Sequence, residues 1–248
     1  MEKRIINKIF AKAKEGKKQI GILIDPDKAS HSYIKAICEK AKLIKADFFL
    51  VGGSLLTDGD MDNCLRLLKS NTEIPLIIFP GSYLQLSDQA DAILFLSLLS
   101  SRNSEMLIGQ QVVAAPYLRN SKVEVISTAY LLIDSGSQTT ASYMSNSTPI
   151  PANKAEIAAS TALAGQYMGM SLIYLDGGSG AKNPVPPSMI QKVKSYTQQP
   201  LIIGGGIDNV EKLQAAYQAG ADVVIIGNAL ENDPNFALEI KKTLDALQ

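Results

Sequence analysis

Eight short apolar segments, rich in β-branched residues, recur along the chain and are separated by segments with helical spacing. The apolar segments are 20–25, 48–51, 76–79, 92–97, 125–133, 172–176, 201–204 and 223–227. The helical patterns are 30–45, 61–70, 104–119, 154–168, 187–196, 209–219 and 234–247. Strands that alternate with helices pair in parallel, and eight of them favour closure into a (β/α)8, or TIM, barrel. The 248 residues match the length of one such barrel, so we expect a single α/β domain over residues 1–248.

One interval between predicted strands is too short for a helix. Only residues 80–91 separate the third strand from the fourth, whereas a parallel crossover needs a dozen or more residues. We therefore expect a modified barrel whose third helix is missing or replaced by a non-helical connector. The gap would open the barrel wall to an apolar groove, unless the same residues pack as an ordinary flank. The candidates for lining it are Tyr83, Leu84, Leu86, Leu98, Leu99, Tyr117 and Tyr130.

Residues 1–18 have the pattern of a basic amphipathic helix. Lysines occupy one face, and Ile5, Ile6, Ile9 and Phe10 recur at helical spacing on the other. We expect this helix to cover the bottom of the barrel with its lysines in water. A basic face for anionic lipid headgroups or a lipid diphosphate is the alternative.

The composition excludes several classes of protein. The 24 basic and 24 acidic residues leave no formal net charge, so nucleic acid is not expected as a partner. The apolar runs are far shorter than the roughly 20 residues needed to cross a bilayer, and the N-terminus lacks the apolar core of a secretory signal. Cys38 and Cys64 lie within helical patterns and are expected to be buried or half-buried thiols in a reducing compartment. A cytoplasmic location follows as an expectation.

Two of the predicted strand ends carry glycine-rich turns that precede a helical pattern. They are the segments 201–207 and 223–229, after the last two strands. In TIM barrels the corresponding loops often form a phosphate site, because glycine lets backbone N–H groups approach an anion near a helix N-terminus. The sequence therefore predicts a phosphorylated ligand. The uncharged segment 135–153, after the fifth strand, is expected to be a loop that covers the substrate.

Oxygen-bearing side chains follow the first two strands. The carboxylates of Asp25 and Asp27 and the hydroxyl of Ser54 suit Mg²⁺, a hard cation that also binds substrate phosphates. Asp27 lies beyond the strand and is expected to cap a turn rather than bind metal. Alternatively, Asp25 is itself a helix cap and Ser54 an ordinary loop hydroxyl.

The chain has a single histidine, His31, in the first turn of a predicted helix. A Ser/His/Asp or Cys/His device at a strand end is therefore excluded, as is a Cys/His metal cluster. Reactions that need little help from a general base fit better. Departure of diphosphate, held by metal and lysine, is one of them.

Five motifs, in this order, carry a resemblance to a known family: GILIDPDK, FFLVGGS, YLDGGSGA, IIGGGI and VIIGNAL. The set resembles the geranylgeranylglyceryl phosphate synthase family, which includes bacterial heptaprenylglyceryl phosphate synthases. These prenyltransferases have a modified TIM barrel that lacks the third helix. The resemblance implies transfer of an allylic prenyl group, with geranylgeranyl diphosphate as the expected donor, to the 3-hydroxyl of sn-glycerol 1-phosphate. It also implies a homo-oligomer, either a dimer or a hexamer. Separately, we expect transient contact of the protein with a membrane surface.

The resemblance implies roles for individual positions. Asp25 and Ser54 match the Mg²⁺ positions, and Tyr174 and Asp176 are the expected catalytic residues, with Asp176 binding glycerol hydroxyls or accepting the proton. The family pattern has glutamate where this chain has Asp176, so the carboxylate is shorter by one methylene. The expected substrate-binding residues are Tyr174, Leu175, Asp176, Gly177, Gly178, Ser179 and Gly180 for the glycerol, with Gly205, Gly206, Gly227 and Asn228 for its phosphate.

Three other functions fit a barrel with a phosphate site. A sugar-phosphate isomerase or cyclase would use paired carboxylates such as Asp25 and Asp176 at opposite strand ends. An FMN-dependent oxidoreductase would place the flavin phosphate in the same turns. A non-catalytic protein would bind glycerol 1-phosphate without turnover.

Overall fold

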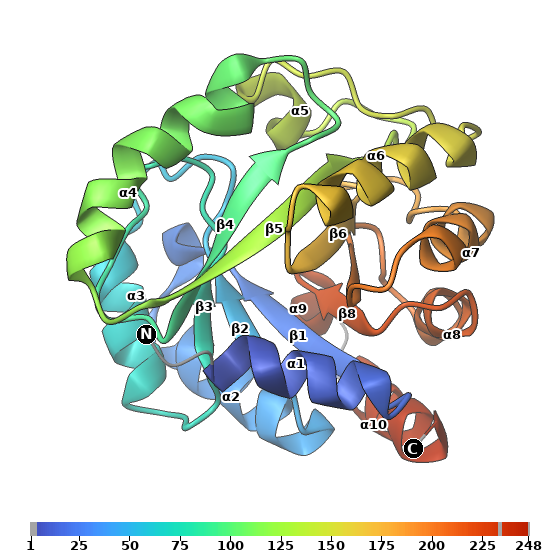
Figure 1. Cartoon of the computed structure of the whole chain (residues 1–248). Coiled ribbons are helices and arrows are strands. Elements are labelled where there is room, and N and C mark those ends of the chain that lie inside the picture. The colour runs from blue at the N-terminus through green and yellow to red at the C-terminus, as the bar shows by residue number, and fades with distance from the viewer. Residues whose placement is uncertain (1–3, 233–234, 248) are drawn as a thin grey trace.

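A closed barrel of eight parallel strands forms the centre of the molecule (Figure 1). The computed structural model describes residues 4–232 and 235–247. The strands are β1 (Gln19–Ile24), β2 (Phe48–Val51), β3 (Leu76–Ile78), β4 (Ala92–Leu98), β5 (Glu124–Leu132), β6 (Leu172–Asp176), β7 (Leu201–Gly204) and β8 (Val223–Ile226). Each strand pairs with its neighbours in the chain, and β8 pairs with β1. The predicted TIM barrel is confirmed.

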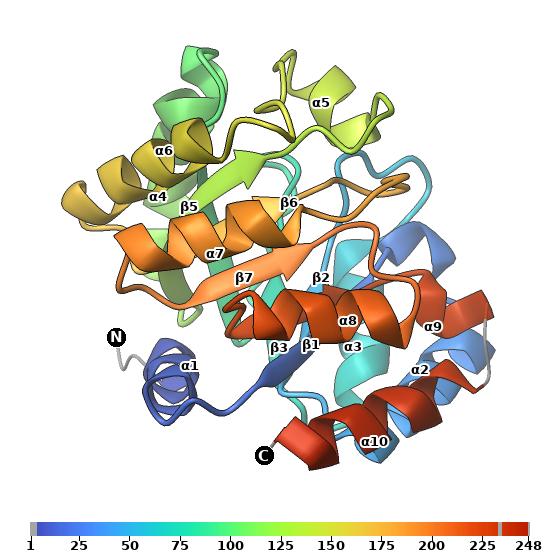
Figure 2. The ribbon, with the colours of Figure 1, turned by 90° about the vertical axis from the view of Figure 1, so that its right-hand side faces the viewer.

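Most of the helices pack around the outside of this barrel (Figures 1 and 2). They are α1 (Arg4–Lys14), α2 (His31–Ile44), α3 (Met61–Lys69), α4 (Gln110–Asn120), α5 (Thr140–Met144), α6 (Ala155–Tyr167), α7 (Pro187–Tyr196), α8 (Val210–Gln218), α9 (Ala229–Asn232) and α10 (Phe236–Leu247). A 3-10 turn η1 (Pro26–Lys28) and a π-helical turn η2 (Glu105–Gly109) complete the set. Pro234, where the last helical pattern begins, lies outside the described residues.

The connector between β3 and β4 contains no helix over residues 80–91, as predicted. A buried side chain, Gln85, organises it instead. The Gln85 amide nitrogen donates to the Gly53 carbonyl (2.9 Å), and its Oε1 accepts from the Gly81 N–H (3.0 Å). These bonds satisfy one backbone group in the connector and one in the turn after β2, and so join the two segments.

Two segments differ from the sequence-based expectations. Segment 135–153 is not all loop, because α5 forms within it, and Thr139 and Ser142 cap that helix reciprocally. The helix expected over 104–119 begins as the π-helical turn η2. The Gln111 amide donates to the Leu96 and Met106 carbonyls, and the Ser97 hydroxyl donates to the Leu107 carbonyl (2.8 Å).

The core consists of two apolar layers separated by the barrel wall. Alternate strand residues point to opposite sides of the wall, so Phe48, Leu50 and Tyr174 fill the barrel interior. Their neighbours Phe49 and Leu175 pack outward against the surrounding helices. Cys38 and Cys64 lie in this outer layer as free, buried thiols, as predicted, and burial raises their pKa to about 11 and about 12.

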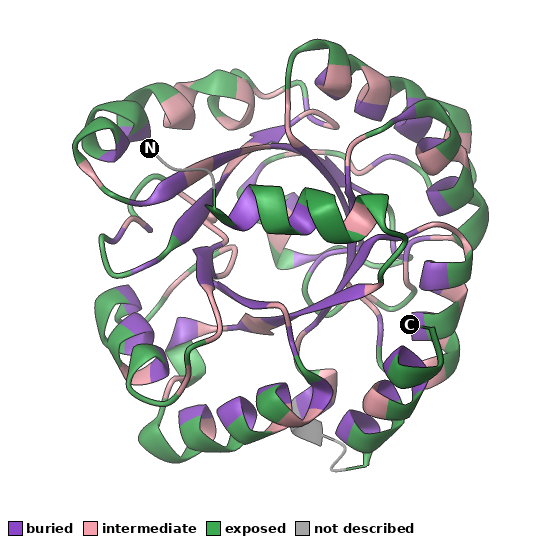
Figure 3. Cartoon of the chain, turned by 60° about the horizontal axis from the view of Figure 1, so that its bottom comes forward, coloured by how far each residue is buried: buried purple, intermediate pink, exposed green. Residues whose placement is uncertain are grey.

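Helix α1 closes the bottom of the barrel (Figure 3). Ile5, Ile6 and Ile9 are buried against the interior layer, which confirms the expected cover. The Glu124 carboxylate, at the start of β5, accepts hydrogen bonds from the N–H groups of Ile5 (2.7 Å) and Ile6 (3.0 Å). These N–H groups lie in the first helical turn, where no backbone partner exists. In the described part of the chain, no helix is both long and apolar enough to cross a membrane.

We predict that Glu124→Gln destabilises the protein by about 2 kcal/mol, because a charged acceptor shared by two buried N–H groups is replaced by a neutral amide. The free energy of unfolding in urea measures this. Glu73→Gln, at an exposed loop position, is the matched control and should change stability far less. Equal stability of the two variants would contradict the assigned capping role.

Candidate functional site

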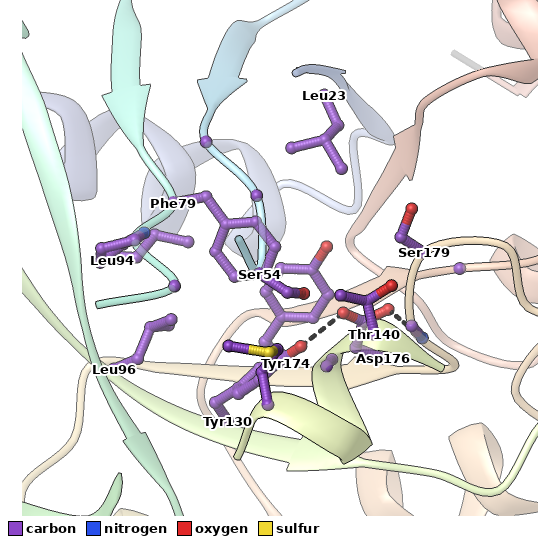
Figure 4. Close-up of a pocket in the computed structure, with 18 of the residues that line it drawn as sticks. Leu23, Ser54, Phe79, Leu94, Leu96, Tyr130, Thr140, Tyr174, Asp176 and Ser179 are labelled. Carbon is purple, nitrogen blue, oxygen red and sulfur yellow. Dashed lines mark hydrogen bonds between the residues drawn. The ribbon is translucent and has the colours of Figure 1, made fainter. Parts of the chain in front are cut away.

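A cavity of about 520 Å³ opens at the carboxyl ends of the strands. Its polar part lies over β6, β7, β8 and β1, and its apolar part extends over β3 and β4 toward α4. Figure 4 shows side chains from both parts around the central Tyr174. The predicted site residues that line it are Asp25, Ser54, Tyr174, Asp176, Gly178, Ser179, Gly180, Gly205, Gly206, Gly227 and Asn228.

Two predicted residues, Leu175 and Gly177, do not line the cavity. Leu175 lies between Tyr174 and Asp176 on β6, so strand alternation directs it outward into the apolar layer beneath the helices. The Gly177 N–H donates to the Gly204 carbonyl (3.0 Å) and extends the pairing of β6 with β7. Both residues shape the turn behind the cavity wall, and direct contact of either with the substrate stays a prediction.

A carboxylate and an ammonium group lie at the two ends of η1, from Asp25 before its first residue and from Lys28 at its last. Asp25 Oδ1 accepts from the Asp27 N–H (3.1 Å), so Asp25 does cap this turn while also lining the cavity. Lys28 Nζ donates to Asn228 Oδ1 (2.9 Å) and so carries a positive charge to the turn after β8. Lys28 was not among the predicted site residues, although it is the last residue of the GILIDPDK motif after the first strand.

Asp27 organises the neighbouring loop. Its carboxylate accepts hydrogen bonds from the Thr57 N–H (3.0 Å), the Thr57 hydroxyl (2.8 Å) and the Gly59 N–H (2.6 Å). The hydrogen bonds from Thr57 lower the pKa of Asp27. Asp27 therefore caps backbone groups, as expected, and it does not line the cavity.

The donor set around Asp25 fits a magnesium ion that is shared with a substrate. Asp25 and Ser54 supply one carboxylate and one hydroxyl to the same cavity. Within residues 4–232 and 235–247, no group of three or more His, Cys, Asp or Glu side chains is arranged to hold a metal alone. Mg²⁺ binds readily through one or two carboxylates when water and phosphate oxygens complete its octahedron.

The turns after β6 and β7 meet at Gly205. This residue has a φ of +79°, and a Cβ atom there would lie 2.8 Å from the Gly178 nitrogen and 2.9 Å from Asp176 Oδ1. Only glycine permits both the backbone conformation and this close approach. The close approach packs the turn after β7 against the turn after β6, so that Gly205 lines the cavity beside the Asp176 carboxylate.

The Asp176 carboxylate is buried at the centre of the site. Its Oδ2 accepts from the Tyr130 hydroxyl (2.6 Å), and its Oδ1 accepts from the Gly178 N–H (2.7 Å) (Figure 4). Burial raises the pKa of Asp176, and the two hydrogen bonds oppose the rise. Burial and the adjacent carboxylate raise the pKa of Tyr130, so its phenol stays protonated and acts as the donor. The sequence predicts Tyr130 only as a candidate for lining the groove, because its contact with Asp176 joins two different strands.

Three aromatic rings separate the polar part of the cavity from the apolar part. Phe79 stacks on Tyr174, with ring centroids 5.2 Å apart, and Tyr130 meets both rings edge to face, at 5.6 Å and 5.5 Å. Beyond the rings, the groove is lined mainly by apolar side chains where the third helix is missing. Its walls include Tyr83, Leu86, Phe95, Leu96, Leu98, Met106 and Ala114.

Three of the groove candidates lie elsewhere. Leu84 projects into solvent, Leu99 packs against the outer apolar layer, and Tyr117 is an exposed residue of α4. Tyr83, Leu86, Leu98 and Tyr130 line the groove as expected. Sequence spacing alone does not distinguish Tyr83 and Leu86 from Leu84, because the connector has no regular period.

The fold and the site together define one class of TIM barrel. In this class, glycine-rich turns after β6, β7 and β8 face a buried carboxylate, and an apolar groove takes the place of the third helix. The chain belongs to the PcrB family, whose model matches residues 14–246. The expected family resemblance is thereby confirmed.

Similar proteins agree with this assignment. The geranylgeranylglyceryl phosphate synthase of Chitinophaga pinensis is 44% identical over 247 residues, which cover 100% of this chain and 97% of the relative. The Thermococcus gammatolerans protein of the same name is 43% identical over 211 residues, 85% of this chain and 83% of the relative. The crystal structure of (S)-3-O-geranylgeranylglyceryl phosphate synthase from Thermoplasma acidophilum, in complex with its substrate sn-glycerol-1-phosphate, superposes with a TM-score of 0.90. It is 35% identical and the match covers 99% of each chain.

Proposed function

We propose that this protein joins an allylic prenyl diphosphate, with geranylgeranyl diphosphate as the expected donor, to the 3-hydroxyl of sn-glycerol 1-phosphate. The products are a prenylglyceryl phosphate ether and diphosphate. The observation that carries the proposal is a single cavity whose polar turns and apolar groove meet at the buried Asp176. A sugar-phosphate isomerase has no use for so long an apolar groove. The names of the relatives support the same reaction.

The glycerol phosphate belongs in the polar part of the cavity. Gly205 and Gly206 after β7, with Gly227 and Asn228 after β8, are the proposed phosphate contacts. Lys28, hydrogen-bonded to Asn228, adds a positive charge beside them. This position leaves the glycerol hydroxyls toward Asp176, whose Oδ1 lies against the turn at Gly205.

The diphosphate of the donor belongs between the phosphate turns and the groove. Asp25 and Ser54 would hold Mg²⁺, which supplies electrostatic stabilisation to the departing diphosphate when bound. The prenyl chain extends past the aromatic rings into the groove lined by Leu96, Leu98 and Met106.

The transfer needs one proton acceptor. The glycerol 3-hydroxyl oxygen forms a bond to C1 of the prenyl group, and the bond from C1 to the diphosphate oxygen breaks with its electron pair on diphosphate. The hydroxyl proton passes to the Asp176 carboxylate. Asp176 acts as a general base only while ionised, so the hydrogen bonds that oppose its raised pKa matter for the reaction.

The protein is also proposed to associate with copies of itself and with a membrane surface. A homo-oligomer is expected from the family resemblance, and a water-insoluble product favours transient contact with a membrane surface. Exposed apolar side chains on η2 and α4, namely Ile108, Val112 and Val113, support the presence of an association surface. We also propose a location in the cytoplasm, which the free thiols of Cys38 and Cys64 support.

The reaction is tested by incubating the purified protein with Mg²⁺, radiolabelled sn-glycerol 1-phosphate and prenyl diphosphates from farnesyl to heptaprenyl. We expect label in the organic phase, with a preferred chain length, and loss of that label with EDTA or in Asp25→Asn. Asp245→Asn, at the opposite end of the barrel on α10, is the matched control and should keep full activity. No product with any donor, from protein that still binds glycerol 1-phosphate, would refute the proposed reaction.

Gly205→Ala should weaken binding of sn-glycerol 1-phosphate by about tenfold or more. The added Cβ strains a backbone with positive φ and pushes apart the turns after β6 and β7. Titration calorimetry measures the Kd. Gly169→Ala is the matched control, since Gly169 has a similar φ of +82° with no atom within 4 Å of the added Cβ. Similar loss of affinity in both variants would show that general strain, not the site, is responsible.

A further inference from the structure

The two oxygens of Asp176 are held by groups from different parts of the chain. Oδ1 accepts from the Gly178 N–H in its own turn, and Oδ2 accepts from the hydroxyl of Tyr130, 46 residues away in sequence. Both side chains are buried, with exposed fractions of 6% for Asp176 and 8% for Tyr130. A phenol hydrogen bond to a buried carboxylate is shorter and stronger than one between neutral groups.

The register of β5 and β6 determines this contact. Tyr130 pairs with Tyr174, and Leu132 pairs with Asp176, so Tyr130 is the diagonal neighbour of the carboxylate. Long aromatic side chains reach diagonal neighbours across a sheet. The ring of Tyr130 is also edge to face with Phe79 and Tyr174, which restricts rotation of the ring and aims its hydroxyl at Oδ2.

The surroundings of Asp176 contain few groups that affect its charge. The titratable side chains that face it are Tyr130 from β5 and Tyr174 from β6. The turn after β7 contributes Gly205, and the segment before α5 contributes Thr139, which packs at Gly178; neither carries a charge. Burial therefore disfavours the ionised carboxylate, and the Tyr130 hydroxyl and the Gly178 N–H are the groups that offset it.

We propose that Tyr130 is a positioning residue for the transfer reaction: its hydroxyl fixes the Asp176 carboxylate and keeps it ionised to receive the proton of the glycerol hydroxyl. The inference rests on the proposed function and adds to it a residue that acts through Asp176. Tyr130 itself neither gains nor loses a proton over the cycle. It donates the same hydrogen bond before and after the transfer.

The test is the pH dependence of kcat and kcat/KM in Tyr130→Phe. The hydrogen bond lowers the pKa of Asp176, so its removal leaves burial less opposed and raises that pKa further. The acidic limb of both profiles should therefore move to higher pH. At neutral pH we expect kcat to fall by about tenfold or more, with the KM for glycerol 1-phosphate changed by less than about twofold.

Tyr217→Phe is the matched control for loss of a buried phenol. The Tyr217 hydroxyl donates to the Gln19 carbonyl (2.8 Å) at the bottom of the barrel, far from the cavity. This variant should lower the melting temperature and leave the acidic limb unmoved. Fluorotyrosine at position 130 is the second variant. Its phenol is more acidic and is a better hydrogen-bond donor, so the acidic limb of the pH profile should move to lower pH. The fluorotyrosine protein should also retain the fold if Tyr130→Phe does not.

The outcomes separate the two proposals. Opposite shifts of the acidic limb in Tyr130→Phe and in the fluorotyrosine protein support the positioning role. An unmoved limb in the variants that fold, with product formed by the wild type, overturns this inference and leaves the proposed function intact. Absence of product from the wild type overturns the proposed function and the inference with it.

Discussion

Backbone hydrogen bonds between β1 and β8, in a register from Gln19 opposite Val223 to Ile22 opposite Ile226, join the two edges of the sheet into a barrel. Closure gathers the carboxyl ends of all eight strands around one opening. Turns that are far apart in sequence, after β1 and after β8, thereby contact each other through Lys28 and Asn228. At the opposite end, α1 covers the interior and Glu124 caps its first turn. The cavity therefore has one entrance region to which both polar and apolar residues contribute.

The missing third helix gives this cavity its second half. A helix after β3 would cover the outer face of the strands there, and the short connector leaves room for apolar side chains from β4, η2 and α4. Gln85 holds the connector against the turn after β2 by hydrogen bonds with the Gly53 and Gly81 backbone groups. The same connector also ends β3 at a point where Phe79 stacks on Tyr174. One short interval thus creates the groove and anchors the aromatic boundary of the polar site.

Burial of the Asp176 carboxylate at the centre of the site is unfavourable for its ionised form. Ionised groups lose solvation when buried, and hydrogen bonds to the charged form recover part of that loss. Here the donors are a phenol on the neighbouring strand and an N–H in a glycine turn. The arrangement needs β5, β6 and β7 in their observed registers, which links the chemistry of the site to the geometry of the barrel wall.

The sequence by itself determined the strands, the missing helix, the glycine turns and the positions of Asp25, Ser54 and Asp176, since hydrophobic period, glycine and chain length are local properties. It also indicated the family, through motifs that are continuous in the chain. Only the tertiary structure decided that Tyr130 holds Asp176, that Lys28 reaches Asn228 and that Glu124 caps α1. Each of these contacts joins residues from 46 to 200 positions apart. Such pairs depend on the register of the strands, which no local pattern encodes.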